Sequence, residues 1–213
     1  MKHDLHHIRN EYSRRSLSKK EVYTDPFKQL QLWLDEALET KALEPTAMIL
    51  STTDNQGRVT SRTVLLKDLQ EAGLIFYTNY NSLKARQINE NPRTAALFLW
   101  AELERQVRIE GSAETISSEE SDRYFESRPE SSKFGAWASD QSNEIPDRKY
   151  LEEKQSGIEK QYMDKKIPRP PHWGGYRIIP DRFEFWQGRK SRLHDRIEYV
   201  NGEDGWSIRR LAP

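Results

Sequence analysis

A twelve-residue stretch near the carboxyl end contains an unusual number of side chains that bind anions. Residues 185–196 read FWQGRKSRLHDR, with four Arg or Lys residues, one histidine and one tryptophan. The pattern predicts a strand, a turn at Gly188 and a second strand from Arg192 onward. In such a strand Arg192, His194 and Arg196 would share one face. Two guanidinium groups beside an imidazole are typical of a site for a planar anionic ligand and unusual in a core.

Two segments nearer the amino end also combine cations with polar groups. In the predicted strand 62–67, one face would carry Arg62, Val64 and Leu66, and the other Thr63, Leu65 and Lys67. Periodicity alone favours a half-buried strand with charged ends. Tyr77 and Thr78 end a strand just before a helix that begins near Ser82, where free backbone N–H groups can hold a phosphate. An ordinary strand–turn–helix connection would have the same pattern.

Length and composition bound the class of protein. The chain of 213 residues can form one hydrophobic core, or at most two small ones. Lys plus Arg and Asp plus Glu both number 34, so the basic excess expected of a nucleic-acid-binding protein is absent. Without cysteine there are no disulfides, thiolate nucleophiles or Cys-ligated metals, and no His, Asp or Glu spacing indicates another metal site. No apolar run is long enough to cross a membrane, so a cytoplasmic protein is expected.

The order of elements predicts a mostly β protein with peripheral helices, of the α+β class. Residues 1–24 are polar and are expected to form a mobile arm, and residues 25–213 to form a single domain. About seven or eight strands are expected, mostly joined as hairpins. Hairpins give antiparallel pairs, and a closed or half-closed antiparallel barrel leaves few exposed edges.

Individual elements are predicted from caps, turns and periodicity. Asp25 and Pro26 form an N-cap followed by a first-turn proline, which starts a helix. Ser117 and Glu120 match a capping box that starts another. Near the carboxyl end, closing strands are expected over residues 176–179, 182–187 and 192–200.

Three carboxyl-terminal segments together carry a family resemblance. Residues 169–177 (RPPHWGGYR), 185–196 and 206–213 (WSIRRLAP) resemble the signature of the pyridoxine (pyridoxamine) 5′-phosphate oxidases, and the likeness extends over nearly the whole chain. It implies a six-stranded split β-barrel that binds FMN and works as a homodimer. It also implies oxidation of pyridoxine 5′-phosphate and pyridoxamine 5′-phosphate to pyridoxal 5′-phosphate. Flavin would accept the hydride from C4′, and dioxygen would reoxidise the flavin and leave as hydrogen peroxide.

The resemblance also assigns residues to the cofactor and to the substrate. The implied FMN contacts are Arg62, Thr63, Val64, Leu65, Leu66, Lys67, Tyr77, Thr78, Lys84, Gln106, Gln141, Ser142, Trp186 and Arg196. The implied substrate contacts are Arg9, Asn10, Glu11, Tyr12, Lys67, Tyr124, Arg128, Ser132, Arg192, Leu193 and His194. Arg192 and His194 are expected to be catalytic, with Arg192 holding the pyridine ring. Since the family builds its site from two subunits, Gln106, Gln141 and Ser142 would reach across the dimer interface.

One position departs from the family pattern. The usual Ser-Arg-Lys reads Ser82-Leu83-Lys84, so a cation expected near the FMN phosphate is replaced by leucine. Arg86 lies close by and is a candidate replacement. The affinity for FMN is therefore the property that this departure affects.

Two other functions are compatible with parts of the pattern. A split-barrel flavin reductase or a deazaflavin enzyme would keep the features of strand 62–67 and of Tyr77-Thr78. It would not need Tyr124, Arg128, Arg192 and His194 together. A non-catalytic carrier of pyridoxal phosphate would bind that compound, but its flavin would not bleach under anaerobic substrate.

Overall fold

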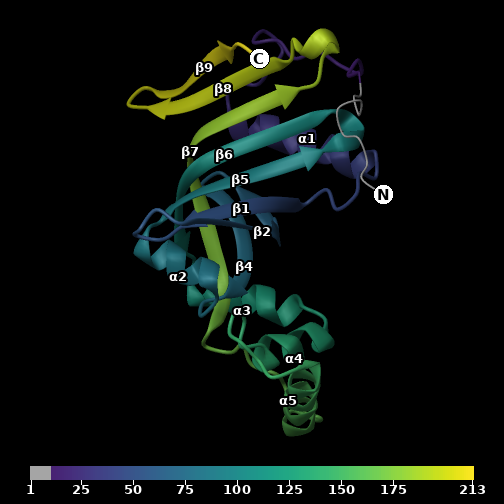
Figure 1. Ribbon diagram of the computed structural model, residues 1–213, viewed down its shortest axis with the longest axis vertical. Helices are drawn as coiled ribbons and strands as arrows, with labels where there is room; N and C mark the ends of the chain where they lie inside the picture. Colours follow the sequence, from purple (N-terminus) through teal and green to yellow (C-terminus); the bar gives the residue numbers. More distant parts are fainter. Residues whose placement is uncertain (1–10) are drawn as a thin grey trace, which may run out of the picture. The chain divides into compact units, whose positions relative to one another are not determined.

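The structure, a computed structural model, describes residues 11–213 (Figure 1). The chain divides into two compact units. The central unit comprises Ile49–Ala95 and Gly111–Ile179, and the terminal unit comprises the residues up to Met48, Ala96–Glu110 and Pro180–Pro213. The expectation of a single domain over 25–213 stays a prediction.

The fold class is confirmed as a mostly antiparallel β protein with peripheral helices. Along residues 11–213 the strands are β1 (Ala47–Thr53), β2 (Val59–Leu65), β3 (Asp68–Gln70), β4 (Gly73–Asn79), β5 (Arg93–Trp100), β6 (Arg105–Thr115), β7 (Trp173–Gln187), β8 (Asp195–Gly202) and β9 (Gly205–Leu211). Their hydrogen-bonded order is β2-β1-β5-β6-β7-β4-β3, with β8 paired to β7 and β9 paired to β8. The β3–β4, β4–β7, β7–β8 and β8–β9 pairs are antiparallel.

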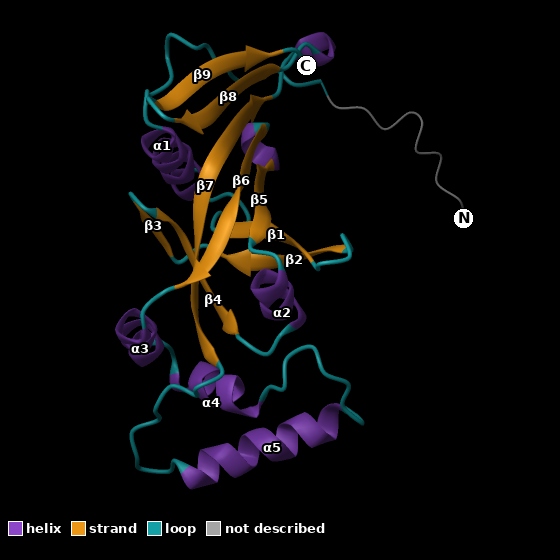
Figure 2. Ribbon diagram, turned by 90° about the vertical axis from the view of Figure 1, so that its left-hand side faces the viewer, coloured by secondary structure: helices purple, strands orange, loops and turns teal. Residues whose placement is uncertain are grey.

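Five α-helices accompany the strands in the described part of the chain (Figure 2). They are α1 (Pro26–Glu39), α2 (Leu83–Glu90), α3 (Ser118–Ser127), α4 (Glu130–Ala138) and α5 (Arg148–Gln161). The two predicted caps are present: Asp25 accepts a hydrogen bond from the N–H of Phe27, and Ser117 from the N–H of Glu120. No helix of residues 11–213 is long and apolar enough to span a membrane.

The carboxyl-terminal strands differ from the prediction in two ways. Residues 176–179 and 182–187 belong to one continuous strand, β7. Its residues 173–178 pair with β4, and its residues 182–187, beyond Pro180, pair with β8. The next strand, β8, begins at Asp195 and not at Arg192. Ser191 and Arg192 have φ angles of 55° and 62°, and they form a short 3₁₀ turn over Lys190–Arg192. Arg192, His194 and Arg196 therefore do not share one face of a strand.

Two adjacent glycines let β7 pass close to β4 within the central unit. Gly175 lies opposite Tyr77, and Gly174 lies opposite Thr78. A Cβ atom on Gly175 would lie 2.4 Å from Cδ1 of Ile116 and 2.9 Å from Cε1 of Tyr77. The side chains of Ile116 and Tyr77 thus both occupy the space that a side chain at position 175 would need.

Gly175→Ala is expected to lower the free energy of unfolding by about 1–3 kcal/mol, because the added methyl group overpacks this contact. Denaturant unfolding measures the change. The control is Gly157→Ala in the interior of α5, where nothing lies within 4 Å of the added atom. That substitution should be neutral or stabilise by up to about 1 kcal/mol. Equal stability of the two variants would show that the β4–β7 contact tolerates a side chain.

Candidate functional site

A pocket of about 870 Å³ lies wholly within the central unit. It is formed by β2, the end of β4, the start of α2, the α3–α4 region, the segment after α4 and the first residue of β7. The sequence-predicted residues that line it are Arg62, Thr63, Val64, Leu65, Lys67, Tyr77, Thr78, Lys84, Tyr124, Arg128, Ser132, Gln141 and Ser142. Leu66, also predicted, has its side chain buried in the core. The pocket thus brings together most of the predicted cofactor residues and four of the predicted substrate residues.

The lining includes four cations and no carboxylate. The cations are Arg62, Lys67, Lys84 and Arg128. No ion pair to any of the four is found within residues 11–213. Lys84 is buried, Arg62 and Arg128 are half-buried and Lys67 is exposed. A pocket with this charge balance attracts anions, because a buried cation without a counter-ion is costly until one binds.

Arg62 is positioned by neutral oxygen atoms. Its Nη1 donates to the backbone oxygen of Leu50 at 3.2 Å and to Oγ1 of Thr52 at 2.6 Å, and its Nη2 donates to Oγ1 of Thr60. Both threonine hydroxyls in turn donate to Oε1 of Gln87, at 2.6 and 2.7 Å. Burial lowers the pKa of Arg62, yet a guanidinium remains charged at neutral pH.

Lys84 is the most deeply buried cation of the pocket, with 7% of its surface exposed. Its Nζ donates to Oγ1 of Thr78, Oγ of Ser82 and Oε1 of Gln141, each at 3.1 Å. Burial, with a smaller contribution from the charge of Arg62, lowers the pKa of Lys84 to about 8. Arg62 and Lys84, two neighbouring cations with only neutral partners, form a suitable binding site for a phosphate group, the Arg62–Lys84 site.

Gln141 links the segment after α4 to the Arg62–Lys84 site. Its Oε1 accepts from both Thr78, at 3.1 Å, and Lys84. Ser142, which follows, has a left-handed backbone with a φ of 72°. Since the amide oxygen of Gln141 is directed to these donors, its N–H groups are the part of the side chain that can bind a ligand.

Aromatic rings form one wall of the pocket. The rings of Tyr77 and Tyr124 are stacked with centroids 3.8 Å apart and planes 12° apart. Trp173 lies nearly parallel to both, at 5.5 Å from Tyr77 and 6.2 Å from Tyr124. Burial raises the pKa of Tyr77 to about 12 and also raises the pKa of Tyr124. The two hydroxyl groups of this wall therefore stay neutral.

The other predicted residues that the structure describes lie in the terminal unit, where aromatic rings surround His194. The rings of Trp186 and His194 have centroids 4.6 Å apart, and Tyr12 lies 5.7 Å from each. Nδ1 of His194 accepts a hydrogen bond from the N–H of Arg189 at 3.1 Å. Burial and the charge of Arg192 lower the pKa of His194. The ring is therefore neutral near pH 7 and carries its proton on Nε2.

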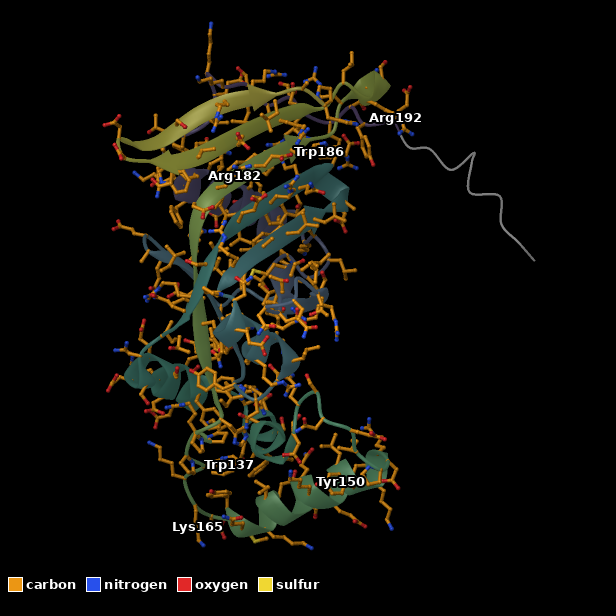
Figure 3. All side chains as sticks on the ribbon, turned by 60° about the vertical axis from the view of Figure 1, so that its left-hand side comes forward. Trp137, Tyr150, Lys165, Arg182, Trp186 and Arg192 are labelled. Atoms are coloured by element: carbon orange, nitrogen blue, oxygen red, sulfur yellow. The ribbon has the colours of Figure 1, made fainter. Side chains whose placement is uncertain are left out.

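Other predicted residues of this unit differ in how free they are to bind a ligand. Arg192, at the turn between β7 and β8, and the neighbouring Leu193 are exposed (Figure 3). Arg196 forms a bidentate ion pair with Glu184, with both N–O distances 2.9 Å. Its guanidinium therefore already has a carboxylate partner. Gln106 is half-buried on β6, and Glu11 is exposed. Arg9 and Asn10 lie outside the described residues.

Several residues of the pocket were not predicted from the sequence, and among them Trp173 contacts the most aromatic rings. Thr60, Asn79 and Ser139 are further polar members of the lining. The side-chain amide of Asn79 donates to the backbone oxygen of Ser139 at 3.0 Å. The available signal for Trp173 was its place directly before Gly174 and Gly175, because glycine inside a strand often marks a close approach of a ligand or of another backbone.

The antiparallel fold and the carboxylate-free pocket define a split-barrel protein with an anion-binding site. Residues 34–162 match the pyridoxamine 5′-phosphate oxidase family, and residues 173–213 match the pyridoxine 5′-phosphate oxidase C-terminal dimerisation region. The chain belongs to this family, which is a family of oxidoreductases.

Curated relatives and solved structures agree with this assignment. The pyridoxine/pyridoxamine 5′-phosphate oxidase of Mannheimia succiniciproducens is 52% identical over 210 residues, 99% of each chain. That of Ralstonia pickettii is 52% identical over 207 residues, 97% of each chain. The crystal structure of PhzG from Burkholderia lata 383, in complex with tetrahydrophenazine-1-carboxylic acid, has a TM-score of 0.90 and 29% identity, covering 96% of this chain and 100% of that one. A pyridoxamine 5′-phosphate oxidase-related, FMN-binding protein from Nostoc punctiforme shares the fold, with a TM-score of 0.70 and 17% identity, covering 88% and 98%.

Anion affinity at the Arg62–Lys84 site is expected to fall as the pH rises through about 8, the pKa of Lys84 in the free protein. A bound dianion favours the charged amine, so binding above this pH must take up a proton. The Kd for inorganic phosphate should rise by about threefold to thirtyfold between roughly pH 7.5 and 9.5. Calorimetry in buffers of different ionisation enthalpy measures both the Kd and the proton uptake.

The control for this prediction is Lys84→Arg, which keeps the charge at every pH of the series. Its Kd should be nearly independent of pH over the same range. A pH dependence that persists unchanged in Lys84→Arg would assign the titration to another group.

Proposed function

We propose that this protein oxidises pyridoxine 5′-phosphate and pyridoxamine 5′-phosphate to pyridoxal 5′-phosphate, with FMN as cofactor and dioxygen as acceptor, releasing hydrogen peroxide. The observation that carries the proposal is a single pocket that has four cations and no carboxylate. A phosphorylated cofactor and a phosphorylated substrate together need two such anion-binding places. Curated relatives 52% identical over nearly their whole length have the corresponding name, which supports the same reaction.

One set of neighbouring pocket residues fits the phosphate of FMN. Arg62 and Lys84 supply charge, and Thr78 supplies a hydroxyl. The amide oxygen of Gln141 is held by Thr78 and Lys84, so its N–H groups can donate to an acceptor on the polar edge of a flavin. Bound FMN would supply the redox chemistry, accepting a hydride from the substrate and passing the electrons to dioxygen.

A second set of pocket residues fits the phosphate of the substrate under this proposal. Arg128 and Lys67 supply positive charge, and Tyr124 and Ser132 supply hydroxyl groups. Phosphate binding there anchors the substrate at a point remote from the carbon that is oxidised. Binding energy from such a remote group orients the reacting part of the molecule.

The residues of the terminal unit complete the site in a homodimer under this proposal. Trp186, Arg192 and His194 all belong to the stretch that matches a dimerisation region. Because Nδ1 of His194 accepts a backbone hydrogen bond, its Nε2–H is left to donate to the substrate. His194 therefore orients a substrate oxygen or nitrogen, and Arg192 holds the ring from its exposed turn.

The apoprotein is expected to bind FMN, at one flavin per subunit, far more tightly than riboflavin. Loss of the phosphate removes charge-assisted contacts to two cations, so the Kd should rise by about a hundredfold or more. Fluorescence titration with FMN, FAD and riboflavin measures this difference. Riboflavin binding as tight as that of FMN would contradict the assignment of the Arg62–Lys84 site to the phosphate of FMN.

The same preparation separates the three candidate functions. Pyridoxine 5′-phosphate added without oxygen should bleach the flavin absorbance, and air should restore it. A carrier of pyridoxal phosphate would bind without bleaching. A flavin reductase would bleach with a reduced nicotinamide and not with pyridoxine 5′-phosphate.

Leu83→Arg is expected to tighten FMN binding. Leu83 lines the pocket at the first residue of α2 and is 40% exposed. A guanidinium there would add a charge-assisted contact to the cofactor phosphate, partly screened by solvent. The Kd for FMN should fall by about threefold to thirtyfold, with kcat little changed.

Arg86→Ala is the matched comparison for Leu83→Arg. Nη1 of Arg86 donates to the backbone oxygen of Asn81 at 2.6 Å, and Arg86 does not line the pocket. Its removal should therefore leave the Kd for FMN within about twofold of the wild type. Strong weakening in Arg86→Ala, with no gain in Leu83→Arg, would assign the phosphate contact to Arg86.

A further inference from the structure

The guanidinium of Arg128 is held in the pocket by aromatic rings. Its Nη1 is buried, and no described residue accepts a hydrogen bond from it. The guanidinium carbon lies 4.5 Å from the ring centroid of Trp173 and 5.6 Å from that of Phe125. An arginine stays charged at neutral pH, so a full charge is placed here without a carboxylate beside it.

Arg105 provides a comparison within the same chain. Its guanidinium carbon lies 4.3 Å from the ring centroid of Trp33, which is a similar geometry. Arg105, however, also forms an ion pair with Glu36. A carboxylate of this kind would fix Arg128 equally well, but it would cancel the charge and compete with a ligand phosphate. An indole ring attracts the cation through its quadrupole and leaves the charge available.

We propose that Trp173 is a positioning residue for Arg128. Its ring holds the guanidinium at the substrate-phosphate end of the pocket and so sets how strongly the site distinguishes pyridoxine 5′-phosphate from pyridoxine. The inference rests on the proposed function, to which it adds the residue that determines selection of a phosphorylated substrate.

The geometry of the Trp173–Arg128 pair is fixed by a third residue. Nη1 of Arg169 donates to the backbone oxygen of Trp173 at 2.6 Å. The same guanidinium donates to Oγ of Ser118 and to Oδ1 of Asp122, both on α3 and both at 2.6 Å. Since Arg128 caps the carboxyl end of α3, Arg169 ties the helix that carries the cation to the strand that carries the ring.

Trp173→Leu removes the π face and keeps an apolar side chain. The KM for pyridoxine 5′-phosphate should rise about threefold to thirtyfold, with kcat within about twofold of the wild type. The kcat/KM for pyridoxine, which has no phosphate, should change by less than about twofold. Trp173→Phe retains a π face and should recover most of the affinity.

Binding of inorganic phosphate gives a second readout that needs no turnover. Trp173→Leu should raise the Kd of the phosphate binding that Arg128→Met weakens measurably. In the Arg128→Met background, Trp173→Leu should have no further effect, because the cation is already gone. Additive losses would overturn the proposal, as would equal losses of kcat/KM for the two substrates.

Trp137→Leu is the matched control. Trp137 lies on α4 in the same unit (Figure 3), donates through Nε1 to the backbone oxygen of Pro168 at 2.8 Å, and does not line the pocket. This variant should lower Tm but leave the ratio of kcat/KM for the two substrates unchanged. A change of that ratio as large as in Trp173→Leu would overturn the specific role. If the wild type failed to oxidise pyridoxine 5′-phosphate while Arg128-dependent phosphate binding still weakened in Trp173→Leu, the proposed function would fail and the positioning role would stand.

Discussion

The pocket depends on cations that are held in place by neutral partners. Arg62 is held by hydroxyl and carbonyl oxygens, Lys84 by two hydroxyls and an amide oxygen, and Arg128 by an indole ring. Each partner orients a charge without cancelling it. Burial of such charges costs free energy, and the lowered pKa of Lys84 has the same cause. An anionic ligand removes that cost, so ligand binding and the stability of the central unit are coupled.

Three arginines of the terminal unit have the opposite arrangement. Arg105 pairs with Glu36, Arg196 with Glu184 and Arg210 with Asp195. The first pair joins β6 to α1, and the other two join neighbouring strands of the β7–β8–β9 part of the sheet. Removal of one partner would leave a charge uncompensated. Arginine thus has either a structural or a ligand-binding role in this chain, and the role depends on the chemistry of its partner. A carboxylate makes an arginine structural, whereas hydroxyl groups and rings leave it free to attract a ligand.

Particular residues show how far the sequence alone could predict the structure. The N-caps at Asp25 and Ser117 are local features, and both were predicted. Strand alternation and the family resemblance also led to the pocket residues of β2 and β4. The left-handed backbone at Arg192 could not be predicted, because no glycine or asparagine marks it. The pairing of Arg196 with Glu184 depends on the register of β7 and β8, and the contacts of Trp173 depend on tertiary packing.

The substrate end of the pocket follows from how closely two strands approach. Gly175 leaves room for the ring of Tyr77 against β7, where any side chain would collide with it. Tyr77 can then stack on Tyr124 and lie parallel to Trp173. Trp173 in turn holds Arg128. A backbone requirement in the sheet is thereby connected, through three packed rings, to the position of a single charge. Under the proposed function, selection of a phosphorylated substrate would depend on the packing of β4 against β7 as well as on the charged residue itself.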